Sequence, residues 1–363
     1  MVKWSEVTDI KNGKNQKKVE DSRGQYPIYG SGGIIGYAND YLCEGDSVII
    51  GRKGNINKPI YVNEKFWNVD TAFGLIPKRN RLFAKYLYYF CVKYNFDKLS
   101  TTVTIPSLTK NNLLNIMMPL PPLETQKRIA KTLDAALELL TMRKQQLAEL
   151  DNLIKLIFYD MFGDPVTNDK GWERKKLSSC CYINPKKTEI NYFTDDLEVS
   201  FIAMSSVSTN GEINTSEIKK YKEVKTGFTY FYENDVLFAK ITPCMENGKG
   251  AIARGLKNHI GFGSTEFHVL RPKKGISNSQ WLYYLSVLPM FRNSAEKFMT
   301  GSAGQKRVPA SFFSKFLVPL PPFPLQVEFA KIIMSIEEQK ALVKKAIEET
   351  QLLFDSLMSQ YFD

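Results

Sequence analysis

The feature that most constrains this chain is an internal repeat with an offset of 200 residues. The sequence Pro-Leu-Pro-Pro at 119–122 recurs at 319–322, and a glutamine follows each copy at the same distance, Gln126 and Gln326. After each copy, apolar residues recur at alternating steps of four and three for more than four heptads. This spacing is typical of the seam of a coiled coil. The repeat therefore predicts two long helices of the same design.

The predicted helices cover 123–162 and 323–363. Beyond their first turns both segments lack glycine and proline, and each begins after a Pro-Pro pair, which cannot continue a helix in the N-terminal direction. We assign to the seams the apolar residues Leu133, Leu140, Leu147 and Ile154 in the first helix, and Ile333, Val343, Ile347 and Phe354 in the second. At about 1.5 Å per residue, each helix forms a rod of roughly 60 Å. The apolar stripe of each rod needs a partner, which is either the other rod or the neighbouring globular domain.

The segments 1–122 and 163–322 also resemble each other, but as globular domains with strands and turns. In each, an acidic turn leads into a short apolar strand that ends in a basic residue and a glycine-containing loop, at 45–54 and 234–250. Each block continues with a strand that contains phenylalanine, a Pro-Lys turn and an aromatic helix. The chain is therefore predicted to be a tandem duplication of a globular domain followed by a rod.

The net charge is distributed unevenly along the chain. The total is +11, of which 1–122 and 163–322 carry +7 each, whereas 123–162 is neutral and 323–363 carries −3. Two basic blocks favour a polyanionic partner. The alternative, scattered solvated lysines, does not predict this alternation.

Basic, amide and hydroxyl side chains gather in loops of both blocks. Nucleic-acid binding uses Lys and Arg to neutralise phosphates, and polar side chains to reach base edges. The candidates in the first block are Arg52, Lys53, Asn55, Thr102, Thr104 and Lys110. The candidates in the second block are Lys240, Thr242, Asn247, Lys249, Ser302, Gln305, Lys306 and Arg307. The pairs Lys186-Lys187 and Lys219-Lys220 are instead interpreted as solvated surface charges.

Few patterns in the sequence suggest catalysis. The five cysteines form no Cys-x-x-Cys pair and there are two histidines, so we expect no metal site, no disulfide framework and no His-dependent catalytic pair. Neither a GxxxxGK[ST] loop nor an Asn/Asp-Pro-Pro-aromatic motif occurs, and Glu217-Ile218-Lys219 fits a metal-dependent nuclease only loosely. The sequence favours binding, with no cofactor in this chain. It contains no apolar run of membrane-spanning length and no signal-peptide pattern, so we expect a cytoplasmic protein.

Together these motifs resemble the DNA-specificity subunit of type I restriction-modification systems. The resemblance rests on the two Pro-Leu-Pro-Pro-x-x-x-Gln elements, on the strand and loop at 235–250, and on the Tyr-Pro-x-Tyr-Gly element at 26–30. It covers the whole chain in order, and the duplicated arrangement is more specific than any single motif.

The resemblance implies an α+β fold with a pseudo-twofold internal repeat. Two mixed α/β target-recognition domains, 1–122 and 163–322, would be separated by two long helices, 123–162 and 323–363, that form an antiparallel coiled coil. Each domain would read half of a bipartite double-stranded DNA sequence. Two methylation subunits would bind S-adenosylmethionine and methylate adenine, and motor-nuclease subunits would cleave with ATP and Mg²⁺.

Three alternatives stay open at this point. The first is a specificity subunit of a related methylation-only or phage-defence complex. The second is a coiled-coil scaffold that binds RNA or the anions of a membrane surface. The third is a metal-dependent nuclease built on Glu217 and Lys219.

Overall fold

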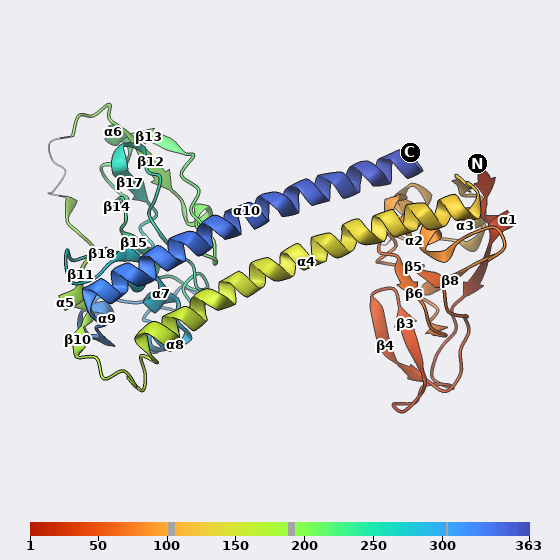
Figure 1. Ribbon diagram of the computed structural model, residues 1–363, viewed down its shortest axis with the longest axis horizontal. Coiled ribbons are helices and arrows are strands. Elements are labelled where there is room, and N and C mark those ends of the chain that lie inside the picture. The colour runs from red at the N-terminus through yellow and green to blue at the C-terminus, as the bar shows by residue number, and fades with distance from the viewer. Residues whose placement is uncertain (101–105, 188–192, 303) are drawn as a thin grey trace. The chain divides into compact units, whose positions relative to one another are not determined.

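The computed structural model describes residues 1–100, 106–187, 193–302 and 304–363, so the predicted DNA-contacting residues Thr102 and Thr104 lie outside the described residues. The chain forms two compact units (Figure 1). Unit 1 combines residues 1–146 with 343–363, and unit 2 is the continuous segment 147–342.

Two helices of 40 residues each begin directly after the Pro-Pro pairs, namely α4 (Leu123–Phe162) and α10 (Phe323–Phe362). Gly163 follows α4 with a φ of +76°, a left-handed conformation that ends a helix at little cost for glycine. Each helix contributes one part to each unit, and the N-terminal part of one packs with the C-terminal part of the other. The two helices therefore run antiparallel within each unit, which confirms the predicted fold class.

Unit 1 is built around a four-stranded antiparallel sheet. The elements outside the long helices are β1 (Val2–Lys3), α1 (Trp4–Val7), β2 (Thr8–Asn12), β3 (Tyr26–Gly30), β4 (Gly33–Ala38), β5 (Ser47–Gly51), β6 (Ile60–Val62), β7 (Trp67–Asn68), β8 (Ala72–Pro77), α2 (Ala84–Lys93), α3 (Lys110–Leu114) and β9 (Met117–Met118). The central sheet has the order β2-β8-β5-β6, and a three-stranded sheet has the order β4-β3-β7. Strand β1 pairs with β9, so the first residues of the chain meet the segment that leads into α4.

Unit 2 repeats the central sheet of unit 1. Its elements outside the long helices are β10 (Arg174–Lys176), α5 (Leu177–Cys180), β11 (Cys181–Ile183), β12 (Glu198–Ile202), β13 (Ile218–Lys220), α6 (Tyr221–Val224), β14 (Thr229–Tyr232), β15 (Val236–Ala239), β16 (Gly250–Ile252), β17 (Ile260–Gly263), β18 (Phe267–Pro272), α7 (Ser279–Val287), α8 (Pro289–Lys297), α9 (Ala310–Lys315) and β19 (Leu317–Pro319). The order β11-β18-β15-β16 matches that of unit 1, strand for strand. A second four-stranded sheet, β13-β12-β17-β14, has no counterpart of that size among the described residues of unit 1.

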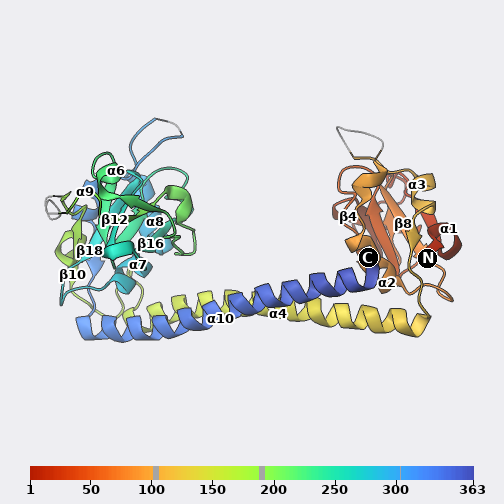
Figure 2. The ribbon, with the colours of Figure 1, turned by 90° about the horizontal axis from the view of Figure 1, so that it is seen from above.

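The apolar stripes of the long helices pack on two partners at once. In unit 1, Ile129 and Leu133 of α4 share a core with Phe354 of α10 and with the aromatic residues of α2 and α1. In unit 2, Phe158 of α4 and Ile333 of α10 share a core with α7, α8 and α9. Helices α2 and α7 accordingly lie against the long helices in Figure 2. Both partners expected from the sequence, the other rod and the neighbouring domain, therefore cover the stripes.

Burial varies along the assigned seams. Six of the assigned seam residues are buried, namely Leu133, Leu140, Ile154, Ile333, Val343 and Phe354, whereas Leu147 and Ile347 are half-buried. Polar side chains interrupt the seam and are paired. In unit 1, Arg143 donates to the carbonyl of Ala346 and to Oγ1 of Thr350. In unit 2, the buried Nζ of Lys340 lies 2.8 Å from carboxylate oxygens of both Asp151 and Glu337.

The repeated glutamine anchors each long helix to its globular block. Gln126 is fully buried, its Oε1 accepts from the backbone N of Phe83 at 2.9 Å, and its Nε2 donates to the carbonyls of Arg81 and Pro121 at 2.9 and 2.8 Å. Both the oxygen and the nitrogen of the amide thus bind the backbone of the turn before α2 and of the Pro-Pro segment.

Gln326 makes the same three hydrogen bonds in unit 2. Its Oε1 accepts from Asn278 N at 3.2 Å, and its Nε2 donates to the carbonyls of Ile276 and Pro321 at 2.9 Å. Gln326 is also fully buried. The glutamine of the repeated motif therefore satisfies buried backbone groups that would otherwise lack partners.

Candidate nucleic-acid interface

A basic residue directly follows the third strand of each central sheet: Arg52 follows β5, and Lys240 follows β15. We call these two residues the strand-end cations. In unit 1, Arg52 N donates to the carbonyl of Thr71 at 2.7 Å, and the carbonyl of Arg52 accepts from Leu108 N at 2.9 Å. Gly54 N then donates to the carbonyl of Pro106 at 3.2 Å.

The strand-end cation of unit 2 is held by the equivalent bonds. Lys240 N donates to the carbonyl of Glu266 at 2.9 Å, and the carbonyl of Lys240 accepts from Val308 N at 2.9 Å. Thr242 N donates to the carbonyl of Lys306 at 3.0 Å. Three matched backbone hydrogen bonds thus place Arg52 and Lys240 at the same position of the two units.

The candidate residues of unit 1 lie on the surface around Arg52. Arg52, Lys53, Asn55 and Lys110 are all exposed, and Lys110 is the first residue of α3. Lys53 forms a β-bridge with Ser107, which brings the loop after β5 to the segment that precedes α3. The guanidinium of Arg52 lies 5.8 Å from the centre of the Phe73 ring, and it forms no ion pair with any residue that the structure describes.

In unit 2 the structure brings the two predicted loops together. Ile241 forms a β-bridge with Arg307, so the loop that carries Lys240, Thr242, Asn247 and Lys249 lies beside the loop that carries Ser302, Gln305, Lys306 and Arg307. Asn247, Ser302, Gln305 and Lys306 are exposed, whereas Lys240, Thr242, Lys249 and Arg307 are half-buried. These eight candidates therefore contribute to one surface.

Two cations of this surface already have protein partners. The guanidinium of Arg307 binds the carboxylate of Glu266 in a bidentate manner, with Nε to Oε2 at 3.0 Å and Nη2 to Oε1 at 2.9 Å, which raises the pKa of Arg307. The ammonium of Lys249 donates to the carbonyl of Met204 at 3.1 Å. Counting basic residues in the sequence did not distinguish such paired cations from free ones.

Arg292 of α8 is a supporting residue that the sequence analysis missed. Its Nη1 donates to the carbonyl of Met245 at 3.0 Å, and its Nη2 donates to the carbonyls of Gly248 and Lys249 at 3.3 and 3.4 Å. The guanidinium also lies 4.0 Å from the centre of the Phe238 ring, and burial lowers the pKa of Arg292 to about 10. Arg292 thus fixes the backbone of the loop that presents Asn247. A single arginine in the sequence of a short helix gave no sign of this role.

His268 is a buried side chain that supports the same surface. The side chain is buried, its Nε2 lies 2.8 Å from the carbonyl of Val308, and its Nδ1 lies 3.0 Å from the side-chain amide of Asn184. Burial lowers the pKa of His268 to about 4, so the imidazole is neutral at pH 7. A neutral imidazole with its proton on Nε2 donates to Val308, whose own N–H holds Lys240.

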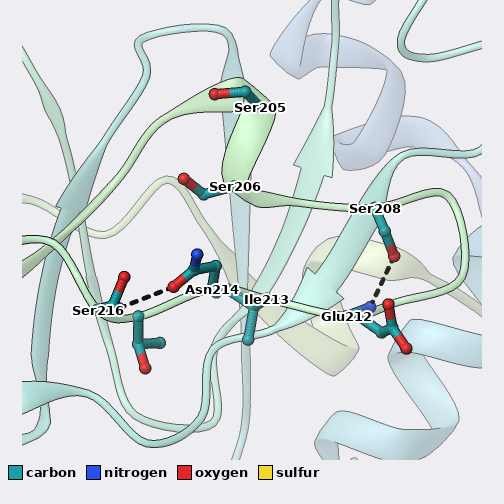
Figure 3. Close-up of a pocket in the computed structure, with 8 residues that line it drawn as sticks. Ser205, Ser206, Ser208, Glu212, Ile213, Asn214 and Ser216 are labelled. Atoms are coloured by element: carbon teal, nitrogen blue, oxygen red, sulfur yellow. Dashed lines mark hydrogen bonds between the residues drawn. The ribbon is translucent and has the colours of Figure 1, made fainter. Parts of the chain in front are cut away.

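A groove rich in hydroxyl groups lies on unit 2 (Figure 3). It has a volume of about 750 Å³ and includes Ser205, Ser208 and Asn214 among its lining residues. Ser208 Oγ accepts from Glu212 N at 3.0 Å, and Asn214 Oδ1 accepts from Ser216 N at 3.0 Å, so these side chains shape their own loop. The lining contains no Lys or Arg, which suits hydrogen bonding to neutral polar groups more than binding of phosphates.

Glu217 and Lys219, the pair considered for a nuclease, form an ion pair with each other at 3.2 Å. Lys219 Nζ also lies 3.7 Å from the centre of the Phe201 ring. Within the described residues, no group of three or more His, Cys, Asp or Glu side chains is arranged to hold a metal ion. The contacts of Glu217 and Lys219 are thus those of a surface ion pair on the second sheet of unit 2.

Comparison with known proteins connects both units to one family. A family model described as "Type I restriction modification DNA specificity domain" matches residues 1–152 and 169–351. The chain belongs to this family. The predicted resemblance to type I DNA-specificity subunits is thereby confirmed.

Relatives in the type I specificity family cover different parts of the chain. The specificity subunits of the type I restriction enzymes EcoAI and EcoEI of Escherichia coli are 41% and 38% identical, over 53% and 55% of this chain. These matches cover 33% and 34% of the two relatives, so the chain spans about a third of their length. The MjaVIII specificity subunit of Methanocaldococcus jannaschii is 24% identical over 90% of this chain and 79% of its own length.

Solved structures of the type I specificity family share the fold of this chain. A crystal structure of the S subunit of a type I restriction-modification system from M. genitalium aligns with a TM-score of 0.59 at 14% identity, and covers 100% of this chain and 95% of the other. A structure from a study of complex assembly and conformational transition of the type I system aligns with the same TM-score at 16% identity, over 99% of this chain and 96% of the other.

Among the described residues, no helix has the length and apolar character needed to cross a membrane.

Proposed function

We propose that the chain is the non-catalytic specificity subunit of a type I restriction-modification complex. Each unit binds one half of a bipartite double-stranded DNA sequence. Partner subunits then methylate adenine and cleave the DNA. S-adenosylmethionine, ATP and Mg²⁺ are bound by those partners and not by this chain.

The observation that carries this proposal is the pair of strand-end cations, Arg52 and Lys240. The same three backbone bonds hold the same position in both units, and at that position each unit presents a cation to its surface. Cations neutralise backbone phosphates, while neighbouring amides and hydroxyls such as Asn55, Asn247 and Gln305 supply donors and acceptors for base edges. Two equivalent surfaces in one chain support a site with two halves.

The long helices offer surfaces for the two methylation subunits. Several large apolar side chains on them are exposed, including Leu156 at 66%, Leu342 at 68% and Leu352 at 70%. Leu156 and Leu342 belong to unit 2, and Leu352 belongs to unit 1, so each unit carries part of such a surface. Exposed leucines on an ordered helix are typical of a surface that a partner covers.

The experiment that tests the proposal is selection of DNA by the reconstituted complex. The chain is assembled with its methylation subunit and incubated with a duplex library of random sequence, and the methylated molecules are sequenced. We expect two short specified blocks separated by an unspecified gap of fixed length. A single contiguous block, or equal binding of RNA and duplex by the complex, would contradict the proposal.

A further inference from the structure

A small pocket of about 230 Å³ lies beside the strand-end cation of unit 2. Its lining comes from the loop after β11, from β14, from the residue after β15 and from the loop before β18. The polar residues that line it are Asn184, Lys187, Thr229, Tyr230, Lys240 and Thr265. No Asp or Glu belongs to the lining.

Two lysines line this pocket, and neither has a counter-ion among the residues that the structure describes. Neither Lys187 nor Lys240 forms an ion pair with any residue that the structure describes. Lys187 Nζ donates to the backbone carbonyl of Lys225 at 3.1 Å and lies 5.8 Å from the centre of the Phe262 ring. Lys187 is also half-buried, so it is not the solvated surface charge expected from the sequence.

The neighbouring carboxylate of Glu266 compensates the charge of Lys240 only in part. Glu266 is the carboxylate that acts on Lys240, but both of its oxygens accept hydrogen bonds from Arg307. Burial lowers the pKa of Lys187 and, as the largest cause, also that of Lys240. Two cations in a poorly solvated pocket are stabilised by an anion that replaces the lost water.

We propose that this pocket binds one backbone phosphate of duplex DNA through Lys187 and Lys240. The hydroxyls of Thr229 and Thr265 supply additional neutral donors for the phosphate oxygens. A phosphodiester is favoured over free phosphate because Lys240 is the strand-end cation and is continuous with the surface of the loop that ends at Arg307. This inference rests on the proposed function, and it assigns Lys187 a role that the charge pattern of the sequence did not.

The salt dependence of DNA binding by the full chain tests the pocket. The logarithm of the binding constant for a duplex falls linearly with the logarithm of the salt concentration, with a slope that counts neutralised phosphates. K187Q and K240Q should each reduce the magnitude of this slope by roughly one. K186Q is the matched control, because Lys186 is the exposed neighbour that does not line the pocket, and its slope should equal that of the wild type. Thermal unfolding of every variant verifies that it is folded.

The outcomes separate the pocket from the wider proposal. A wild-type chain that binds no duplex even at low salt would contradict the proposed function. A chain that binds duplex, with equal slopes for K187Q and the K186Q control, would overturn the pocket alone. Inorganic phosphate forms the second arm: if phosphate raises the melting temperature of the wild type but not of K187Q while the DNA slopes stay equal, the pocket binds a free anion and the proposed phosphodiester contact is wrong.

Discussion

Units 1 and 2 share a scaffold but differ in what surrounds the strand-end cation. The sheet order, the glutamine anchor and the three backbone bonds at the cation are the same in both. Arg52, however, is exposed on its surface, whereas Lys240 is half-buried in a pocket beside the paired Arg307. Unit 2 also adds a second four-stranded sheet and the hydroxyl-rich groove. A repeated scaffold with different surfaces is suited to two half-sites of different sequence.

The largest expected effect concerns the core of each unit, in which the long helices pack on the globular block. Leu133→Ala and Ile333→Ala remove equivalent, fully buried side chains, so each should destabilise its own unit by about 3 kcal/mol through lost burial and the resulting cavity. Hydrogen exchange, measured separately for peptides of each unit, reports the change. Leu147→Ala, at a half-buried seam position, is the control and should cost about 1 kcal/mol. Equal protection losses for Leu133→Ala and Leu147→Ala would show that the seam is not packed as described.

The glutamine anchors provide the next test. Gln126→Ala and Gln326→Ala each leave one backbone N–H and two carbonyls without their partner, so each should cost about 2–3 kcal/mol. Gln146→Ala, at an exposed position of α4, should cost almost nothing. Denaturant unfolding followed by fluorescence and hydrogen exchange measures both. A large difference between the stability losses of Gln126→Ala and Gln326→Ala would contradict the structural equivalence of the two units.

The stability of the two units should respond differently to acid. The β5–β8 and β15–β18 registers place Phe73 of unit 1 at the position of His268 in unit 2. The pKa of His268 is about 4 in the folded protein because of burial, with smaller effects of Val308, Lys240 and Glu266, against about 6.5 in the unfolded chain. The unfolded chain therefore binds more protons between these values. The contribution of His268 to the free energy of unfolding is greatest above about pH 6.5 and falls as the pH drops toward 4.

We expect unit 2 to lose about 1.5 kcal/mol between pH 6.5 and pH 5 through His268 alone. Hydrogen exchange of unit 2 at these two pH values, compared with unit 1 of the same sample, is the measurement. The control is His268→Phe, which copies unit 1 and should remove the difference in pH dependence between the units. Equal loss of protection in both units of the wild type would contradict the prediction.

The smallest expected effect, in free energy, concerns DNA recognition. Arg52→Ala and Lys240→Ala should each weaken binding by about 1 kcal/mol, roughly fivefold to tenfold, when a single charge-assisted contact is lost. The loss should follow one half-site in each case, because the two residues belong to separate units. Methylation of duplexes with either half-site randomised, by the reconstituted complex, measures this selectivity. An equal effect of one substitution on both half-sites would contradict the modular assignment.

The sequence predicted those parts of the molecule that depend on local patterns. The 4-3 spacing predicted both long helices because neighbouring turns of one helix carry the whole signal. The repeated Gln126 marked the motif, but its role was not predictable, since its amide bonds Phe83 and Arg81, which are more than 40 residues away. The sequence did match the two strands that end in Arg52 and Lys240, but the three equivalent backbone bonds at these residues were not predictable, because their partners lie in other segments of each unit.

The net charge of each block was predictable, but which of its cations are already paired with a carboxylate was not. Arg307 and Lys187 look alike in sequence, as basic residues in polar loops. The structure pairs Arg307 with Glu266 and leaves Lys187 without a carboxylate partner among the described residues. Such pairing depends on contacts between strands and loops that are distant in sequence, so composition and spacing carry no signal for it.

The division of the long helices between the units has a consequence for biosynthesis. Unit 2 is one continuous segment, 147–342, whereas unit 1 needs residues 343–363 to complete its core. On the ribosome, the first block emerges early, but its aromatic helix α2 must wait for Phe354 and Met358, which are translated after all of unit 2. The domain that is synthesised first is therefore the one that matures last, and during translation its exposed apolar face is a natural substrate for chaperones.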